Sequence, residues 1–395
     1  MSIGLLWMVA TALAEAPLWI PEAQYRPRWE LDTGRDGDPD NGVVSYVTHR
    51  ARLGGSLSTQ DVSFRFVLND VRTFGEEADT RKDFSADGLD VPIAELDWRV
   101  TDRVSVQVGR MQRSIYNERL FAIANWRQPG RSFDGARVAW IGDAVTIEAR
   151  GLLIREGDDV DFGTRDQVFQ DEADGVLLFL TADIAADIAA GALQIRPLVF
   201  VNQDQALDLF RVTGGVTGFW ETDRIRLEYD VYGQTGQTED DRIRAGMAHV
   251  AATLTPALRG APTIALWYDI LSGDGDADDG VFSTFNTLYG ANHKYYGTID
   301  MVTFFVGGPR DGQGLHDPAL KLGFAPAKRL TIKLDIHGFF AAAPIDDSFF
   351  AVETDASLGV ALAERLKLYG GASLWLPADR SGNEGFVYTM LDARL

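Results

Sequence analysis

Apolar and polar residues alternate along most of the chain, in runs that are separated by short polar breaks. In residues 95–100 the even positions are Leu, Trp and Val, whereas the odd positions are Glu, Asp and Arg. Residues 225–232 and 330–337 repeat this pattern of apolar residues at every second position. A period of two places successive side chains on opposite faces of a β-strand. The pattern therefore predicts strands with one apolar and one polar face.

The links between these runs alternate between tight turns and long polar segments. Tight turns are expected at residues 101–103 and 141–143, and long links at residues 111–131 and 272–314. A soluble β protein shows the same alternation of faces, but short turns at one rim and long loops at the other are typical of outer-membrane barrels. We therefore predict an all-β, transmembrane, antiparallel up-and-down barrel of 18 strands, with both chain ends on the tight-turn side. The expected strands are residues 23–32, 44–55, 61–72, 91–100, 103–110, 132–141, 144–154, 174–182, 190–202, 210–220, 224–236, 242–254, 261–271, 315–325, 329–341, 351–362, 366–378 and 385–395.

One further run, residues 296–306, also has the character of a strand. A strand there would break the alternation of tight and long links, so we assign this run to the long link, folded into the lumen. Lipid-facing strand positions need to be apolar, with aromatic side chains near the interfaces. The residues expected in this outer belt are Trp29, Tyr46, Trp98, Trp140, Tyr268 and Leu376.

The N-terminus predicts export. Residues 1–14 are almost wholly apolar and end in the small-x-small form Ala12-Leu13-Ala14, which is typical of a signal peptide. A buried N-terminal helix is the alternative. No other apolar run approaches the roughly 18 residues that a spanning helix requires. Residues 23–395 are therefore expected to form a single outer-membrane barrel domain.

The net charge of the chain argues against one class of partner, although basic residues are concentrated in one part of the sequence. The net charge of −21 argues against a nucleic-acid partner, because phosphates are neutralised by surplus Lys and Arg. The polar faces of the first seven predicted strands are nevertheless rich in arginine. Arg50 and Arg52 lie on the strand that follows Arg26 and Arg28, and like charges on adjacent strands are hard to explain as bracing. Pairing with Asp or Glu remains the structural alternative for any single arginine.

Signatures of catalysis and metal binding are missing. The chain has no G-x-S-x-G, H-E-x-x-H, P-loop or dinucleotide-binding motif, and its five histidines are scattered. Residues 274–280 begin like a calcium loop, but Asp279 occupies the glycine position and Phe285 the final glutamate position. We therefore expect no catalytic residue, no metal site and no cofactor.

Several segments, taken together and in order, resemble the alginate export porins of the bacterial outer membrane. The matching segments are 48–54 (THRARLG), 68–75 (LNDVRTFG), 108–110 (VGR), 118–120 (ERL), 125–126 (NW), 130–135 (GRSFDG), 272–274 (SGD), 285–289 (FNTLY), 292–297 (NHKYYG) with Asp300, and 353–355 (ETD). The resemblance implies an 18-stranded barrel whose basic lumen passes an anionic uronic-acid polymer, with inward-folded loops as constrictions or gates. Through the matching segments it places Arg50, Arg52, Arg72, Arg110, Arg119, Arg131, Arg137 and Lys294 along the path.

These observations predict a passive outer-membrane channel for anionic solutes, with a uronic-acid polysaccharide such as alginate, or its oligosaccharides, as the expected solute. The alternative is a structural or partner-binding barrel with a self-paired, non-conducting interior. Expected partners are outer-membrane lipid and lipopolysaccharide, the anionic solute, and periplasmic export components. Between Arg110 and Arg137 we expect Glu118 and Asp134 to hold Arg119 and Arg131 in place. The predicted pore residues are Arg26, Arg28, Arg50, Arg52, Arg72, Arg110, Arg119, Arg131, Arg137 and Lys294, with Glu118, Asp134 and Asp300 as acidic partners.

Overall fold

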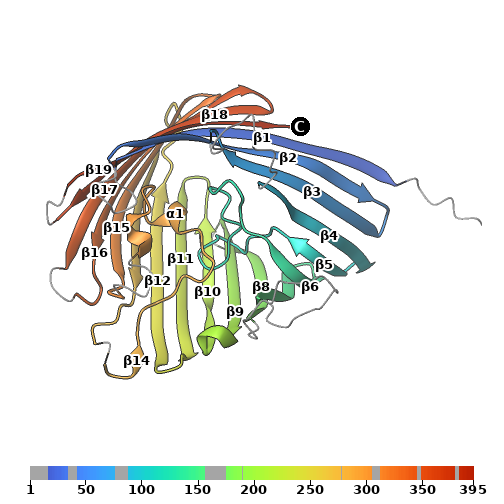
Figure 1. Cartoon of the computed structure of the whole chain (residues 1–395), viewed down its shortest axis with the longest axis horizontal. Coiled ribbons are helices and arrows are strands. Elements are labelled where there is room, and N and C mark those ends of the chain that lie inside the picture. Colours follow the sequence, from blue (N-terminus) through green and yellow to red (C-terminus); the bar gives the residue numbers. More distant parts are fainter. Residues whose placement is uncertain are drawn as a thin grey trace, which may run out of the picture.

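A computed structural model describes residues 17–33, 42–75, 88–155, 175–188, 190–276, 278–304, 312–344, 348–378 and 382–395. The proposed signal peptide lies outside these residues. The described chain is almost entirely β-structure (Figure 1). Its strands are β1 (Leu18–Asp32), β2 (Val44–Ser58), β3 (Val62–Thr73), β4 (Leu89–Thr101), β5 (Val104–Met111), β6 (Phe133–Ile141), β7 (Val145–Arg155), β8 (Gly175–Ile188), β9 (Gly191–Asp204), β10 (Leu209–Glu221), β11 (Ile225–Gln237), β12 (Arg242–Leu254), β13 (Thr263–Leu271), β14 (Val281–Phe282), β15 (Leu315–Ala327), β16 (Leu330–Phe340), β17 (Phe349–Ala363), β18 (Leu366–Pro377) and β19 (Glu384–Arg394).

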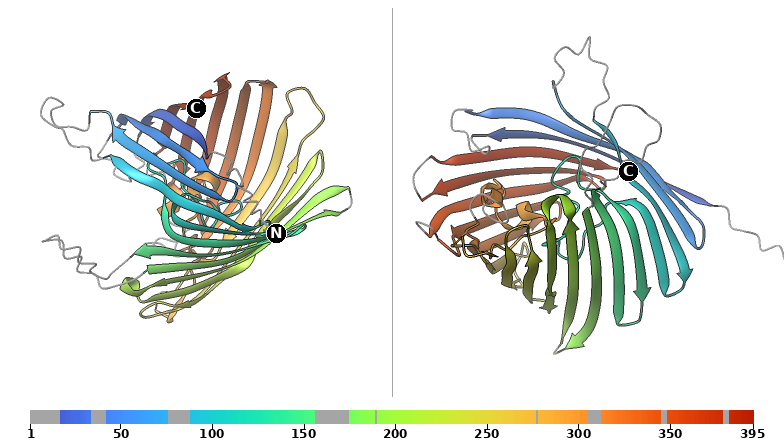
Figure 2. Two further views of the ribbon diagram at one scale, coloured as in Figure 1. Left: turned by 90° about the vertical axis from the view of Figure 1, so that its right-hand side faces the viewer. Right: turned by 60° about the horizontal axis from the view of Figure 1, so that its bottom comes forward.

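The strands close into an 18-stranded antiparallel barrel, as predicted (Figure 2). Each barrel strand pairs with its neighbours in the sequence, and β1 pairs with β19 to close the ring, with Gln24 opposite Arg394. The two-residue β14 is additional, because it only pairs in parallel with the start of β12. The first barrel strand begins and the last one ends at the rim of the tight turns, where Leu18 is opposite Ser58 and the Arg394 N–H donates to the Arg365 carbonyl. The predicted alternation of tight turns and long links is therefore correct.

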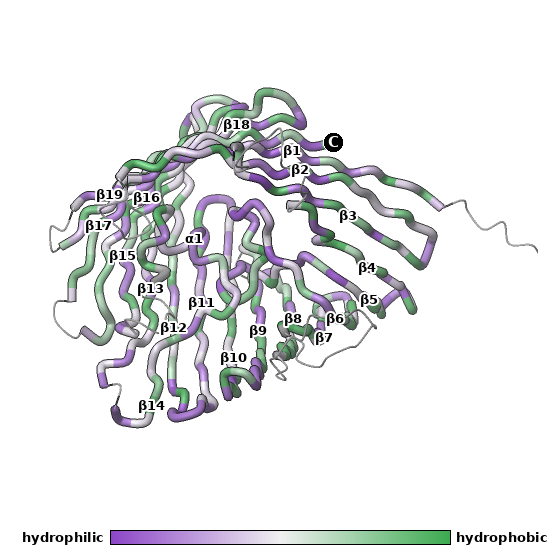
Figure 3. The backbone as a smooth tube through the Cα atoms, in the orientation of Figure 1, coloured by the Kyte–Doolittle hydropathy of each residue, from purple (hydrophilic) through white to green (hydrophobic). Residues whose placement is uncertain are grey.

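The two faces of the wall carry opposite kinds of side chain, and the alternation is visible along the strands in Figure 3. Outward positions such as Leu53 and Trp98 are 66% and 48% exposed, as expected for side chains that meet lipid. Trp29, Trp140, Tyr268 and Leu376 also lie on this face. Tyr46 does not, and that prediction is wrong. It is opposite Glu30 in the register, and its hydroxyl donates to that carboxylate at 2.5 Å inside the barrel.

Two long links fold into the lumen. The link between β5 and β6 and the link between β13 and β15 run inside the ring in Figure 1, the second carrying the short helix α1 (Asn292–Tyr295) and a 3₁₀ turn at Met301–Phe304. The described part of the run 296–306 is thus loop, as predicted, and its Ile299 and Val302 are fully buried. Between the two links and the wall lies an apolar core that includes Phe121, Phe133 and Phe285. No helix among the described residues is long and apolar enough to cross a membrane.

Candidate functional site

Four arginines of β1 and β2 form a row on the lumen face of the wall. Arg26 lies directly opposite Arg50, and Arg52 is one step toward the chain-end rim, opposite Gln24. Arg28 is one step toward the long loops, opposite Thr48. Alternate residues of a strand share one face, and directly opposite residues of antiparallel strands share it too, so this register gathers all four side chains. We call Arg26, Arg28, Arg50 and Arg52 the arginine row.

A short segment of the β5–β6 link, residues 124–130, lies against this row, and we call it the finger. Its backbone carbonyls accept hydrogen bonds from all four arginines of the row. Arg26 donates through Nη1 to the carbonyl of Asn125 at 2.8 Å and through Nη2 to that of Arg127 at 3.1 Å. Arg28 Nη1 donates to the carbonyl of Trp126 at 2.6 Å. The finger therefore presents a string of neutral acceptors to positively charged donors.

Side-chain amides and the end of the finger complete these contacts. The Gln128 side-chain oxygen accepts from Arg26 Nε at 3.0 Å, and its amide nitrogen donates to Thr48 Oγ1 at 3.0 Å. Arg50 Nη2 donates to Asn125 Oδ1 at 3.0 Å, and Arg52 Nη2 donates to the carbonyl of Pro129 at 3.3 Å. Every arginine of the row therefore contacts the finger.

Three members of the row have no carboxylate partner. Arg28 pairs with Glu30. Within the described part of the chain, Arg26, Arg50 and Arg52 have no carboxylate oxygen within 4.0 Å. Arg26 and Arg50 are nevertheless only 3% and 1% exposed. Burying an unpaired cation is costly, and here oriented carbonyl dipoles replace part of the lost hydration. Arg50 Nε is buried without any acceptor, so this compensation is incomplete.

Cavities lie on both sides of the finger. The larger, of about 810 Å³, is lined by Arg28 and Glu30 of β1 and by Arg72, and it opens toward the long loops. The smaller, of about 280 Å³, lies toward the chain-end rim and is lined by Glu22, Gln24, Arg50, Arg52 and Arg65. Asn125 of the finger lines both of them. The row therefore passes from one cavity to the other behind the finger.

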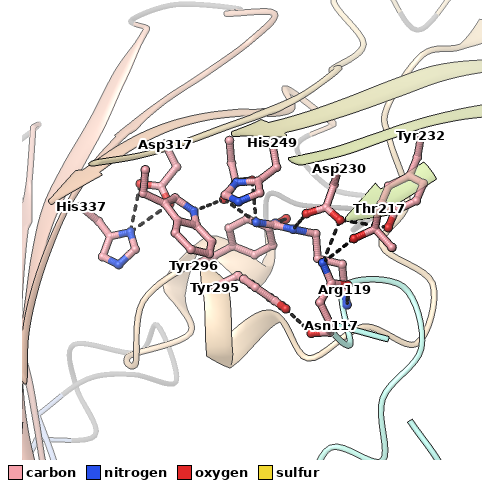
Figure 4. A network of polar contacts seen from close by, with 12 residues as sticks. Asn117, Arg119, Thr217, Asp230, Tyr232, His249, Tyr295, Tyr296, Asp317 and His337 are labelled. Atoms are coloured by element: carbon pink, nitrogen blue, oxygen red, sulfur yellow. Dashed lines mark hydrogen bonds and ion pairs between the residues drawn. The ribbon is translucent and has the colours of Figure 1, made fainter. Parts of the chain in front are cut away.

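The arm of the link before the finger is fixed to the opposite wall by Arg119 (Figure 4). Its Nε is 2.8 Å from Asp230 on β11, and its Nη2 is 2.9 Å from Asp269 on β13. Tyr295 and Tyr296 of the second link pack against the guanidinium, with Tyr295 centred 4.1 Å away. Burial disfavours the charged form, but Asp269, Tyr296 and Asp230 outweigh it and hold the pKa of Arg119 well above its ordinary value. This buried cluster ties both inner links to the wall.

The polar network continues along the wall beyond Arg119. His249 Nδ1 lies 3.0 Å from Asp269, and His337 Nδ1 lies 2.9 Å from Asp317 (Figure 4). Lys321 Nζ contacts His337 Nε2 at 3.1 Å and Asp335 at 3.1 Å. Each of these charged groups therefore has a partner that can carry the opposite charge, in contrast to Arg26, Arg50 and Arg52 of the arginine row.

Three more predicted site residues, Arg137, Lys294 and Asp300, lie inside the barrel with acidic or imidazole partners. Arg137 pairs with Glu148. The prediction for Arg72 is wrong, because Arg72 borders the larger cavity but lies opposite His49, on the outward face that also carries the exposed Leu53, where it is 2.9 Å from Asp70. In the same cavity Lys294 is 3.0 Å from Glu118, and Asp300 is 3.0 Å from His293 Nδ1. Arg131 also lines this cavity and donates to the backbone carbonyls of Ala122 and Tyr289.

Two further predictions about this region are wrong. Glu118 and Asp134 do not hold Arg119 and Arg131, because Arg119 reaches across the lumen to the wall and Glu118 binds Lys294 instead. Arg110 and Asp134 are paired with each other at 2.6 Å. They do not face the lumen, since Arg110 shares its face of β5 with the exposed Val108, whereas Gln107 and Met111, on the other face, are buried.

Some contacts that shape the site were not predicted from the sequence. Gln128, the main side-chain contact of the finger, was not among the predicted site residues, and the attachment of Arg119 to Asp230 and Asp269 was not predicted either. The alternation of the strands places both aspartates on the inward face, but it does not identify their partner. Their pairing with a residue more than a hundred positions away depends on the closed ring.

Comparison with known proteins identifies a family. The family model described as "Alginate export" matches residues 22–351. No curated protein sequence resembles the chain significantly.

Solved structures show the same fold at low sequence identity. OccAB4 of Acinetobacter baumannii is 12% identical, with a TM-score of 0.65 and coverage of 97% of this chain and 99% of that one. A BenF-like porin of Pseudomonas fluorescens Pf-5 is 9% identical, with a TM-score of 0.65 and coverage of 95% and 98%. OccK2 (OpdF) of Pseudomonas aeruginosa, solved in complex with glucuronate, is 12% identical, with a TM-score of 0.62 and coverage of 96% and 99%. Family and fold are those of outer-membrane channels, and the chain belongs to the alginate export family of bacterial outer-membrane porins.

Proposed function

We propose that this channel passes anionic solutes passively, and that its solutes are uronic-acid saccharides such as alginate or its oligosaccharides. The observation that carries the proposal is the arginine row between the two cavities. Three of its four guanidiniums have no carboxylate of the described chain in ion-pair contact. An anion that reaches them meets positive charge that the protein itself has not neutralised.

The chemistry of the row suits a carboxylate. Guanidinium groups bind carboxylates through two parallel, charge-assisted hydrogen bonds. Conduction also requires that each site bind weakly enough to release the solute. A line of similar arginines meets this need. An anion can pass from Arg52 to Arg50 and on to Arg26 without being trapped at any one of them, because each site resembles the next. Membership of the alginate export family and the glucuronate complex of OccK2 agree with this class of solute.

Planar-bilayer recordings test the proposal. In a gradient of potassium chloride the reversal potential should show preference for chloride, and oligoglucuronate should reduce the chloride current. The double variant Arg50→Gln with Arg52→Gln should lose most of both effects. Arg196→Gln is the matched control, because Arg196 also faces the lumen but is already paired with Asp183 at 3.0 Å.

Two results would contradict the proposal. The first is a preference for cations, or a preference for anions that the double variant leaves unchanged. The second is negligible current with and without oligoglucuronate, which would favour a barrel with a structural or partner-binding role. Other lumen arginines, such as Arg65 with Glu22 and Arg137 with Glu148, are paired as such a role would require.

A further inference from the structure

We infer that the finger, residues 124–130, is a displaceable occupant of the arginine row, and that an anionic solute opens the path by taking its place. This inference rests on the proposed function. It adds that the resting channel is closed by the protein's own backbone carbonyls. Five successive residues, 125–129, supply acceptors to the four arginines.

The finger is built to move as a unit. Its base is closed by a hydrogen bond from the Arg131 backbone N–H to the Ile123 carbonyl at 2.7 Å. Ala124 and Gly130 at its two ends have φ of +48° and +75°, in the left-handed region. Segments bounded by such turns can swing on a few dihedral angles. A change at these two positions moves the tip and leaves the base in place.

The rest of the link is held far more firmly than the finger. Arg119 is buried between two aspartates, and Phe121 packs against Phe133 and Phe179 with ring centroids 4.4 and 4.8 Å apart. Breaking those contacts would leave buried charges unpaired, which is strongly unfavourable. The backbone carbonyls of the finger instead accept hydrogen bonds from arginines that a solute can equally satisfy.

Carboxylates are the stronger competitors for the row. A hydrogen bond from a guanidinium to a carboxylate is charge-assisted at both ends, whereas the carbonyls of the finger are neutral. A solute that offers several carboxylates can replace several carbonyls at once. Trp126 opposes this exchange, because its ring stacks on His293 at 4.3 Å and lies under Arg28 at 4.2 Å. The finger is therefore held well enough to close the path at rest.

The finger lies between the two cavities, so its movement changes the path that joins them. Along β1, Glu22 and Gln24 line the smaller cavity and Arg28 and Glu30 line the larger one, with Arg26 between them. The finger covers Arg26, whose side chain donates five hydrogen bonds to it. Displacing it joins the two cavities along the row.

A pair of glutamine variants in the same link tests the inference by single-channel recording. Gln128→Ala removes the side chain that accepts from Arg26 and should raise the resting open probability about tenfold, as expected for the loss of hydrogen bonds to a charged group. Gln112→Ala is the matched control, because Gln112 donates a hydrogen bond to Ser132 at the foot of the link and is not hydrogen-bonded to an arginine of the row. Equal open probabilities in the two variants would overturn the inference. Retained heat-modifiable migration on gels shows that each barrel is folded.

Crosslinking supplies a second test, in which the finger is held in place instead of being loosened. The chain has no cysteine, so Thr48→Cys with Gln128→Cys gives one defined pair at a place where the native side chains are in contact. A short, disulfide-forming bifunctional reagent should hold the finger on the row, lower the current at least tenfold and abolish the response to oligoglucuronate. Reductant should restore both.

A crosslinked channel that still conducts and responds to oligoglucuronate like the reduced one would show that the finger does not move. The reversal potential separates the two proposals. If anion preference persists while the finger variants have no effect, the displaceable finger fails and the anion channel stands. If anion preference is absent, the proposed function itself fails.

Discussion

Arg26 and Arg50 lie directly opposite each other on β1 and β2, and no carboxylate of the described chain is in ion-pair contact with either guanidinium. Like charges placed opposite each other on one face of a sheet destabilise it. Here both cations are stabilised by the finger instead, through Asn125 and Gln128. The wall and the inner loop thus depend on each other at this point.

Replacing Arg50 by glutamate should weaken anion preference. The new carboxylate would lie opposite Arg26 and pair with it, so the row would lose positive charge. A unit charge about 10 Å from an ion contributes roughly 0.4 to 1.7 kcal/mol between bulk-water and protein-surface dielectrics. The chloride-to-potassium permeability ratio should therefore fall by about two- to seventeenfold per unit charge changed. Arg103→Glu, with the same charge change at an exposed tight turn, is the control, and an equal effect of both variants would disprove a special role of the row.

Asp269→Asn should loosen both inner links while the barrel stays closed. Asp269 is fully buried and accepts from Arg119 and Trp267, so the variant leaves the Arg119 cation with a single acidic partner. Removing one partner of a buried ion pair costs about 3–5 kcal/mol. Hydrogen exchange followed by mass spectrometry should show faster exchange in residues 115–122 and 285–299 but not in the strands.

The control for that variant is Asp134→Asn. Asp134 pairs with Arg110 on the outer face, and its side chain is 51% exposed, so the change should cost no more than about 1 kcal/mol. Unchanged exchange in the inner links of Asp269→Asn would mean that Arg119 does not hold them.

The inner link should become less stable in strong alkali, because Tyr116 then loses its proton. Burial raises the pKa of its phenol to about 12 from an ordinary value of 10.0, and its hydroxyl donates to the Ala182 carbonyl at 2.7 Å. The folded form therefore retains the proton after the unfolded form has lost it. The stabilising contribution of Tyr116 is complete below pH 10 and decreases as the pH rises toward about 12.

Ultraviolet titration of phenolate measures this effect. The difference between the wild type and Tyr116→Phe should be one tyrosine that titrates near pH 12. If the tyrosine that the variant lacks titrates near pH 10 instead, Tyr116 is accessible to solvent and the packing of this arm is not as described.

Gly297→Ala should displace the second inner link. Gly297 has φ of +84°, and a Cβ there would lie 2.3 Å from a carboxylate oxygen of Glu353. The same carboxylate accepts the Ile299 backbone N–H at 2.9 Å, so that bond should be lost as well. The substitution at positive φ costs about 1 kcal/mol by itself, and the clash adds to it. Faster hydrogen exchange around Ile299 is the expected readout.

Gly280→Ala separates the cost of the positive φ from the cost of the clash with Glu353. Gly280 also has positive φ, at +73°, but a Cβ there meets nothing within 4 Å. It should show the backbone cost alone. Similar local destabilisation in both variants would contradict the role assigned to the contact with Glu353.

Strand positions and the arginine row could be anticipated because they depend on local periodicity. Alternation at period two defines each face, and the order of tight and long links excludes a strand at residues 296–306. Arg50 then comes to lie beside Arg26 because hairpin pairing is fixed by the tight or long link between consecutive strands. The local rules failed for Tyr46, because a polar aromatic residue can suit either face, whereas the prediction for Arg110 came from the family resemblance although Arg110 shares its face of β5 with Val108.

The sequence by itself determined an outer-membrane barrel with a basic face on its first strands, since those features follow from the order of neighbouring residues. Only the tertiary structure decided which charges stay unpaired. Arg119 finds Asp230 and Asp269 across the lumen, while Arg26, Arg50 and Arg52 meet the backbone of the finger. The physical reason is that an ion pair inside a barrel depends on distances between strands and loops far apart in the chain, which are set by closure of the ring.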